Sequence, residues 1–376
     1  MLCKMLRPGF ALVAATLLIF AAGCKSESNP NANSGAGASA GSGKRFVFLI
    51  NTPNDYWNAC KAGLVEGEKE FQLKDAGLSI SMESNDGTAQ GQVDSLRQFG
   101  TQSDIVGVAL TVVQADNAAI VDEMKKLQAK GVKVFTVDGD VNRDKFRDAR
   151  PYYIGTNNIE AGKLLGAATK KVLEARKVDK GAYVQFAGYT DNDNARNRMN
   201  GVKEGLGSSY EDRDRMSDET DYNRAQENVR IALTNHADLV ALVGIWAYNG
   251  PEIAVVVNQR KARDQVAVVT FDADSRSIEA MEAGNMDVMC VQDPYKMGLQ
   301  AVKLLKAMHL DDQATIKEMF PNAGQPDGDI YTTGLKLVVP DAGSPLKKED
   351  YAGSDIEFLT VSEMKAWLKK LGLKSS

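Results

Sequence analysis

Histidine is almost absent from this 376-residue chain, which contains only His236 and His309. Neither lies in an H-E-x-x-H sequence or a Ser/His/Asp pattern, which argues against a zinc site and a histidine base. A Walker A loop is also missing. The formal net charge of −5 provides no basic excess for a nucleic-acid surface. We therefore expect no metal, no cofactor and no nucleic-acid partner.

The acidic loops do not match a calcium site either. Asp138, Asp140 and Asn142 fit the first three ligand positions of an EF-hand loop. However, Arg143 replaces the required glycine and Ala149 replaces the terminal glutamate. The sequence therefore predicts no calcium ligand set here.

Long apolar runs are missing outside the N-terminal region. There, two basic residues precede an apolar run over 10–20 that is too short for a stable membrane span. Small residues follow it, so residues 1–23 are predicted to be an export signal. The sequence before Cys24 resembles the lipobox of bacterial lipoproteins, although Ala21 stands where that family usually has leucine. This resemblance implies acylation of Cys24 and a periplasmic or other extracytoplasmic, membrane-anchored lipoprotein; secretion without a lipid anchor is the alternative.

Residues 24–43 are rich in Ser, Asn, Gly and Ala and have no apolar periodicity. They are predicted to be a disordered tether between the membrane and the folded part. Only two cysteines lie beyond it, Cys60 and Cys290, and both are in apolar periodic segments. Burial as free thiols and a disulfide between them both remain open.

From Lys44 onward, apolar β-branched runs alternate with helical patterns. The predicted strands cover 45–50, 78–82, 105–110, 132–137, 182–187, 239–246, 265–271 and 287–291. The predicted helices begin near Asp55, Gln90 and Ala115 and then cover 159–175, 194–206, 222–235, 251–260, 275–283 and 295–309. This alternation predicts an α/β protein with two doubly wound parallel-sheet lobes, and the chain length is compatible with two lobes.

Polar or aromatic side chains follow the ends of five of these runs. They are Asn51, Asp138, Trp246, Asp272 and Gln292. Ligands of open parallel sheets bind beyond the carboxyl ends of the strands. We therefore expect these residues to surround one small polar ligand. Carboxylates, amides and arginine suit the hydroxyls of a sugar, and aromatic rings suit its C–H faces.

Seven stretches of the chain contain polar, charged or aromatic residues of these types and resemble stretches of a known family. In chain order they are LINTPNDYWNACKAG with Asn54, Tyr56 and Trp57, VFTVDGDV with Asp138, NARNRMNGV with Arg198, DETDYNRAQ with Tyr222, GIWAYNGPEIA with Trp246 and Asn249, VVTFDAD with Asp272, and MCVQDPYKMG with Gln292. Together, residues 44 to about 340 resemble a periplasmic sugar-binding protein of the ribose-binding type, the receptor of an ABC importer.

The resemblance implies the type I periplasmic binding protein fold, in which a three-segment hinge joins two lobes. It implies crossings between the lobes near 138–157, 272–292 and 325–335. The expected parts are an N-terminal lobe over 44–155 plus 293–328, a C-terminal lobe over 156–292 plus 329–340, and an extension over 341–376 that ends in a helix. It also implies a monomer that works with an ABC permease.

The resemblance further implies how a sugar is held. Asp138, Arg198, Asp272 and Gln292 are expected to bind hydroxyls, and Tyr56, Trp57 and Tyr222 to sandwich the ring. Gly139 stands where ribose binders carry an arginine, so a pentose, a hexose and a related polyol such as a cyclitol all remain open as ligands.

Alternatives remain open at this point. The chain could be the sensor subunit of a signalling receptor, or an exported glycoside-acting enzyme that uses Asp138 and Asp272 as paired carboxylates. At single residues, Tyr56 and Trp57 could pack in the core, the two aspartates could cap the helices that follow them, and Arg198 could be an exposed surface residue.

Overall fold

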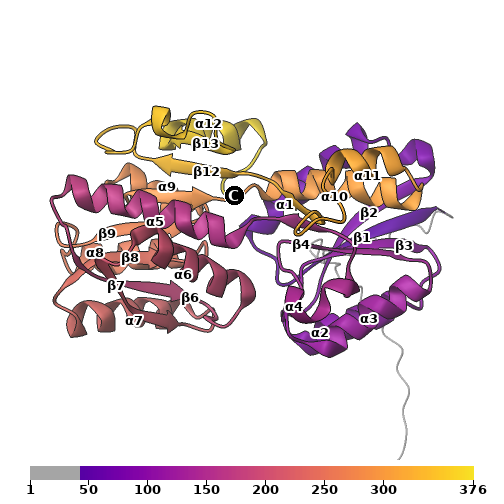
Figure 1. Ribbon diagram of the computed structural model, residues 1–376, viewed down its shortest axis with the longest axis horizontal. Coiled ribbons are helices and arrows are strands. Elements are labelled where there is room, and N and C mark those ends of the chain that lie inside the picture. The colour runs from indigo at the N-terminus through magenta and orange to yellow at the C-terminus, as the bar shows by residue number, and fades with distance from the viewer. Residues whose placement is uncertain (1–42) are drawn as a thin grey trace, which may run out of the picture. The chain divides into compact units, whose positions relative to one another are not determined.

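Two separate β-sheets organise residues 43–376, the part of the chain that this computed structural model describes (Figure 1). The export signal over 1–23, the acylated Cys24 and nearly all of the tether lie outside the described residues. Within residues 43–376, no helix has the length and hydrophobicity that crossing a bilayer requires.

All strand pairs of the first sheet are parallel. Its strands, in spatial order, are β11 (Ile330–Thr332), β5 (Tyr153–Gly155), β4 (Lys133–Val137), β3 (Ile105–Leu110), β1 (Lys44–Ile50) and β2 (Leu78–Ser84). Its helices are α1 (Asp55–Glu70), α2 (Ala89–Phe99), α3 (Ala118–Ala129), α4 (Arg143–Phe146), α10 (Pro294–His309) and α11 (Gln313–Met319). We call this sheet and these helices the first lobe.

Helices cover both faces of the first sheet because successive strand residues point to opposite sides. In β1, Phe46 and Phe48 pack in a core with residues of α1, α10 and α11. Val47 and Leu49 pack in a second core with residues of α2 and α3. The apolar run of β1 is therefore buried on both faces, as expected for a parallel sheet.

The second sheet is parallel except for the antiparallel pair β10 and β12. Its strands, in spatial order, are β13 (Ile356–Thr360), β12 (Leu335–Val339), β10 (Val288–Val291), β9 (Ala267–Phe271), β8 (Leu239–Gly244), β6 (Gly181–Ala187) and β7 (Tyr210–Ser217). Its helices are α5 (Asn158–Ala175), α6 (Asp193–Leu206), α7 (Tyr222–Asn235), α8 (Asn249–Gln259), α9 (Ser275–Glu282) and α12 (Val361–Lys370). We call these elements the second lobe. In it, α5 and α6 cover one face and α7, α8, α9 and α12 the other.

The α/β fold of two doubly wound sheets is confirmed, and the predicted strands and helices are present with small differences at their ends. The strands that the sequence missed are β5, β7, β11, β12 and β13. Strand β7 has the sequence YEDRDRMS, whose charged side chains form ion pairs such as Arg215–Asp212 at 2.6 Å. It lies at a sheet edge, where it needs no apolar run, and so it gives no periodic signal.

The chain passes between the two sheets three times, at residues 156–157, 292–293 and 333–334. We call these three segments the hinge. The assignment of residues 329–340 to the second lobe holds for β12 but is wrong for β11. The backbone of Ile330–Thr332 instead pairs with the free edge of β5 in the first sheet. The extension over 341–376 adds β13 to the edge of the second sheet, beside β12.

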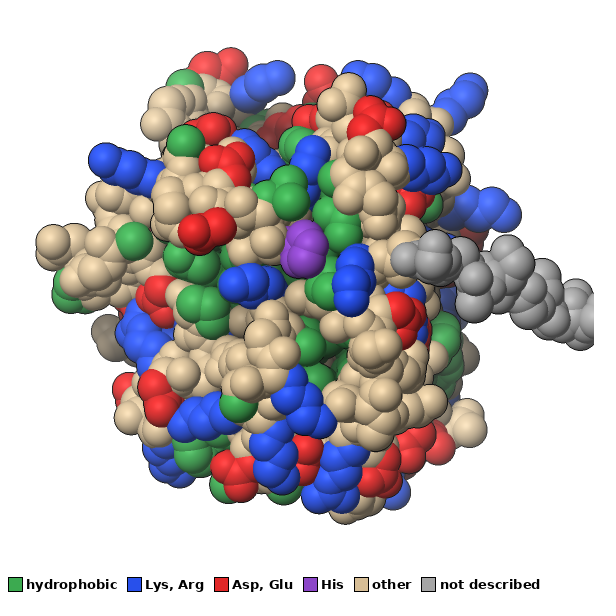
Figure 2. Space-filling view, turned by 90° about the vertical axis from the view of Figure 1, so that its right-hand side faces the viewer, with side chains coloured by type: hydrophobic (Ala, Val, Ile, Leu, Met, Phe, Trp, Pro, Cys, Tyr) green, Lys and Arg blue, Asp and Glu red, His purple; other side chains and the backbone are tan. Residues whose placement is uncertain are grey.

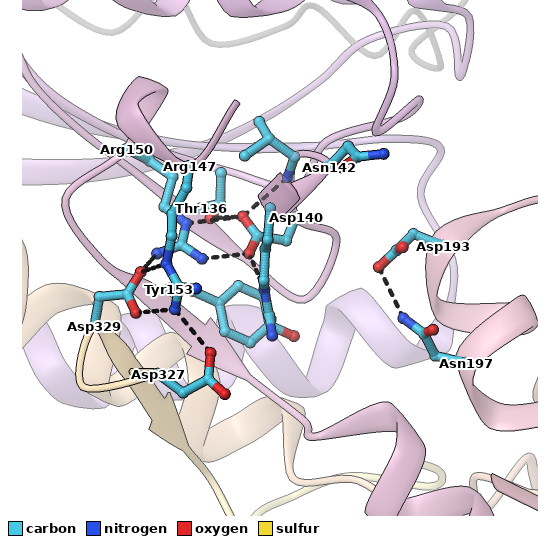
Figure 3. A network of polar contacts seen from close by, with 12 residues as sticks. Thr136, Asp140, Asn142, Arg147, Arg150, Tyr153, Asp193, Asn197, Asp327 and Asp329 are labelled. Atoms are coloured by element: carbon cyan, nitrogen blue, oxygen red, sulfur yellow. Dashed lines mark hydrogen bonds and ion pairs between the residues drawn. The ribbon is translucent and has the colours of Figure 1, made fainter. Parts of the chain in front are cut away.

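A buried network of ion pairs fixes the approach to the third hinge segment (Figure 3). Arg150 donates to both carboxylate oxygens of Asp140, at 3.0 and 2.6 Å, and also contacts Asp329 just before β11. Arg147 lies 2.5 Å from the same Asp329 carboxylate. Burial by itself raises the pKa of Asp140, but the hydrogen bonds and charge of Arg150, the charge of Arg143 and the Thr136 hydrogen bond together lower it below its ordinary value. The loop after β4 is thereby tied to the start of β11.

We expect Arg150→Met to destabilise the chain by about 3 kcal/mol, because it leaves the buried Asp140 carboxylate without its main partner. Urea unfolding followed by circular dichroism measures this. Lys125→Met, which removes only the exposed pair with Asp148, is the control and should change the midpoint little. Equal effects of the two substitutions would contradict this role of Arg150.

Candidate functional site

Two aspartates that follow central strands adopt left-handed backbone conformations. Asp138 follows β4 in the first lobe with φ of 62°, and Asp272 follows β9 in the second lobe with φ of 61°. Such conformations cost energy for residues other than glycine and often mark functional sites. Neither aspartate caps the next helix, because Asn142 caps α4 and Asp274 caps α9. The capping alternative is therefore wrong.

Asp138 is held in place by two tyrosines. The Tyr56 hydroxyl donates to Asp138 Oδ1 at 2.8 Å and lies 3.4 Å from the sulfur of Met297. The Tyr153 hydroxyl donates to the Asp138 carbonyl oxygen at 2.9 Å. One carboxylate oxygen of Asp138 thus has a protein donor, and the other is left to accept from another group.

Asp272 lies between Arg198 and Gln292. The Gln292 amide nitrogen donates to Asp272 Oδ1 at 3.0 Å, and Arg198 Nη1 lies 3.9 Å from Asp272 Oδ2. Arg198 is only 2% exposed, so the alternative of an exposed surface arginine is wrong. Its guanidinium also donates to Asn158 Oδ1 at 2.9 Å and covers the ring of Phe271.

Glycines place Arg198 by letting α5 and α6 approach closely. A Cβ on Gly162 would lie 2.2 Å from the Arg198 carbonyl oxygen, and a Cβ on Gly201 would lie 2.2 Å from the Ile159 carbonyl oxygen. Any larger side chain at these positions would push the helices apart. Arg198 would then move away from Asn158 and Asp272.

Charges of the second lobe act on groups of the first lobe. Burial raises the pKa of Asp138, the Arg198 charge lowers it, and the Asp272 charge raises it again. Burial, Asp138 and Asp272 together hold the pKa of Tyr56 well above its ordinary value. Burial likewise raises the pKa of Asp272, against the effect of Arg198. We call Tyr56, Asp138, Arg198, Asp272 and Gln292 the inner cluster, because both lobes contribute to it.

Side-chain oxygens without a hydrogen-bond partner lie beyond the carboxyl ends of the strands, as Asp138 and Asp272 do. Asn51 Oδ1, Thr156 Oγ1 and Gln292 Oε1 are buried and have no hydrogen-bond partner among the described residues. Asn51 follows β1, and the other two lie in the first and second hinge segments. Buried polar atoms in proteins are nearly always bonded to protein, water or ligand. These three atoms can accept hydrogen bonds from a ligand.

The second lobe also carries an aromatic cluster of Tyr189, Tyr222, Trp246 and Tyr248. The rings of Tyr222 and Tyr248 are 5.1 Å apart, and those of Tyr189 and Trp246 are 6.1 Å apart. Tyr222 is 52% exposed, with the Arg276 guanidinium 5.4 Å from its ring centre. The cluster offers exposed ring faces, as a C–H face of a ligand requires.

Three of the predicted site residues have their side chains engaged in the fold. Asn54 caps α1 by accepting from the Trp57 backbone nitrogen. Trp57 is 5% exposed and packs in the core of the first lobe, as the core alternative predicted. Asn249 is 1% exposed, and its amide joins the Trp246 backbone to Asp218. Helix capping thus uses the side-chain oxygen of Asn54, core packing holds the ring of Trp57, and both ends of the Asn249 amide bond within the second lobe.

The structure explains on steric grounds why glycine, and not the arginine of ribose binders, stands at position 139. A Cβ at this position would lie 2.7 Å from Thr111 Oγ1 and 2.8 Å from the Val112 carbonyl oxygen. The loop after β3 therefore occupies the space that a side chain would need.

Sequence reasoning missed Asp218 and Asn158. Asp218 is fully buried and accepts hydrogen bonds from Tyr248 and Asn249. Asp218 follows β7. Because the sequence did not predict this strand, it gave no sign that Asp218 stands at a strand end. Asn158 accepts from Arg198 and is the first residue of α5. In the sequence, the stretch YIGTNNIEAGK indicates only that a helix begins there and not that Asn158 contacts an arginine.

Metal-ligand groups and cysteines play no part in the inner cluster as the structure describes it. Residues 43–376 hold no group of three His, Cys, Asp or Glu side chains that could bind a metal. Cys60 and Cys290 are both buried and unpaired.

One surface hollow is lined by Lys44, Ile105 and Val132 among others. It lies at the amino ends of β1, β3 and β4, which is the end of the sheet opposite Asp138. At the outer end of the first lobe, basic side chains lie among acidic ones (Figure 2).

Comparison with known proteins agrees with this geometry. A family model described as a periplasmic binding protein domain matches residues 46–312. A search of curated proteins finds no match. Among solved structures, an ABC transporter solute-binding protein from Burkholderia graminis C4D1M in complex with D-arabinose aligns with a TM-score of 0.67 and 22% identity. The alignment covers 84% of this chain and 99% of that one.

Two further solved structures are similar. A periplasmic solute-binding protein from Actinobacillus succinogenes 130z with bound D-allose aligns with a TM-score of 0.66 and 16% identity, over 79% of this chain and 97% of that one. The XylFII–LytSN complex aligns with a TM-score of 0.60 and 21% identity, over 70% of this chain and 93% of that one. At these identities the likeness establishes the fold. With the family match over 46–312, this chain belongs to the periplasmic binding protein family.

Proposed function

We propose that this chain captures a small neutral sugar or related polyol between its two lobes and delivers it to an ABC permease. The inner cluster is the observation that carries this proposal. In it, the Asp138 carboxylate of the first lobe accepts from Tyr56, and the Asp272 carboxylate of the second lobe lies between Arg198 and the Gln292 amide. The Arg198 charge lowers the pKa of both carboxylates. A polyol fits this set because each hydroxyl can donate to a carboxylate and accept from arginine or an amide.

The charge of the inner cluster favours a neutral ligand. Two carboxylates face one guanidinium, so an ionised cluster carries a net negative charge. An anionic sugar, such as a uronic acid or a sugar phosphate, would add like charge to a buried site, which is costly. The aromatic cluster, above all Tyr222, supplies a ring face for the C–H groups of a sugar.

The comparisons support a sugar ligand. Relatives with this fold were crystallised with D-arabinose and with D-allose, an aldopentose and an aldohexose. Membership of a periplasmic binding protein family places the chain outside the cytoplasm, and we propose acylation of Cys24 as its anchor and a monomer as its working state. Because the relatives are binding proteins, we propose binding without catalysis and no role for Asp138 and Asp272 as a hydrolytic pair.

Hinge closure is the proposed mechanism. The three hinge segments can turn the lobes relative to each other, and a sugar that contacts Asp138 and Asp272 together favours the closed state through contacts that exist only there. The permease would then recognise the closed form.

A sensor role is the second candidate. It is favoured by the similarity to XylFII, which is found in a complex with LytSN. Binding to a purified permease, compared with binding to a receptor ectodomain, would separate importer from sensor.

A thermal-shift screen tests the proposed ligand class. We expect at least one neutral pentose, hexose or cyclitol to raise the melting temperature of the chain, since a ligand that binds only the folded state stabilises it by mass action. Glucuronate and glucose 6-phosphate serve as charged controls and should raise it less. No shift with any neutral sugar would contradict the proposal.

Asp272→Ala should weaken binding of the best sugar by about tenfold to more than a hundredfold, because one charged hydrogen-bond partner is worth roughly 1.5 to 3 kcal/mol. Isothermal titration calorimetry measures the change. Asp272→Asn, which tolerates the left-handed conformation and retains one acceptor oxygen, should lose less. Asp264→Ala, an exposed position in the same lobe, is the matched control; equal affinity of Asp272→Ala and this control would rule out the assignment.

Sugar affinity should fall as the pH is lowered. Burial raises the pKa of both Asp138 and Asp272, so protonation begins at a higher pH than for a free aspartate near 3.9. A protonated carboxyl is a weaker acceptor than a carboxylate, and affinity therefore decreases toward acid pH. Calorimetry between pH 7 and pH 4.5, with circular dichroism to confirm folding, measures this. Constant affinity over the whole range would contradict it.

A further inference from the structure

The segment over 341–376 packs onto the second lobe beyond the part that the family model matches (yellow in Figure 1). It supplies β13, which pairs with β12, and α12, whose buried residues Val361, Met364 and Leu368 join the core of this lobe. We call this segment the C-terminal extension. Two lines of contacts lead from it to the inner cluster.

The first line runs through Lys336 of β12, which is 4% exposed. Its ammonium group lies 4.3 Å from the ring centre of Trp367 in α12 and 3.5 Å from Glu357 in β13. The same ammonium donates to Asp293 Oδ2 at 2.6 Å. Asp293 follows Gln292 directly and caps α10 by accepting from the Lys296 nitrogen. The extension thereby covers the buried ion pair that fixes the second hinge segment.

The second line runs through Ser376, which is 2% exposed. Its main-chain oxygen accepts from the Ala273 nitrogen at 2.8 Å, and its nitrogen donates to the Ala273 carbonyl oxygen at 3.2 Å. Ala273 follows Asp272, whose left-handed conformation needs support from its surroundings. This pair of backbone bonds fixes the residue next to the site carboxylate.

We propose that the C-terminal extension is a positioning element of the binding site, which holds Asp272 through Ser376 and Gln292 through Trp367, Lys336 and Asp293. The two lines end on Ala273 and Asp293. These residues directly follow Asp272 and Gln292, which bond to each other in the inner cluster. The inference that this affects ligand capture rests on the proposed function, whereas the positioning itself does not.

Hydrogen exchange of the ligand-free chain tests the positioning. The variants are a chain that ends at Leu373, Trp367→Leu, and Trp367→Phe, which keeps an aromatic face toward Lys336. Lys369→Ala, an exposed position of α12, is the control. The readout is exchange at the Asp272 nitrogen, which donates to the Cys290 carbonyl oxygen, and at the Gln292 nitrogen, which approaches Asp272 Oδ1.

We expect the Asp272 amide of the shortened chain, and the Gln292 amide of Trp367→Leu, to exchange about tenfold faster than in the wild type. Trp367→Phe and Lys369→Ala should match the wild type, and β3 of the first lobe should be unchanged in every variant. Faster exchange confined to α12 and β13 would overturn the proposal, as would equal exchange in Trp367→Leu and Trp367→Phe. No sugar is present in this experiment, so a failure of sugars to bind would overturn the proposed function without altering this result.

Discussion

Burial of two carboxylates around a single guanidinium is the constraint on which the rest of this structure depends. Asp138 and Asp272 come from different lobes, and among residues 43–376 Arg198 is the cation whose charge lowers the pKa of both. Ionised groups in such a place cost several kcal/mol each unless donors surround them. Protein donors satisfy them only in part, since Tyr56 serves one carboxylate and Gln292 the other. The proposed ligand, rich in hydroxyls, would supply the donors that the protein leaves out.

The two lobes use different means to bring these groups to one place. Parallel strands deliver Asp138 and Asp272 at their carboxyl ends, where the left-handed backbone turns each side chain out of its sheet. Close packing of Gly162 and Gly201 lets α6 carry Arg198 inward. The hinge is fixed at its margins by buried ion pairs, Asp140–Arg150 on the first lobe and Asp293–Lys336 at the second crossing. In the proposed hinge closure, these ion pairs would confine the motion to the short segments between them.

Sequence reasoning could predict the sheets and the residues directly beyond their strands, because long apolar runs mark where a buried strand ends. Asp138, Asp272 and Gln292 were found in this way. Tyr56 and Trp57 could not be told apart, since neighbouring residues of a helix differ by about 100° in direction and only the packed structure shows which one faces the core. Asn54 and Asn249 fit the pattern of a ligand amide, yet local backbone groups use their side chains. Asp218 was missed because a charged edge strand precedes it.

A crystal structure of the chain with the sugar that raises its melting temperature most tests directly whether the two carboxylates share one guest. Hydroxyl oxygens of a single sugar should lie within about 3.2 Å of both Asp138 and Asp272, with Arg198 donating to the same molecule. A sugar that contacts only one of these aspartates, or that occupies a different surface of either lobe, would contradict a site built from both lobes.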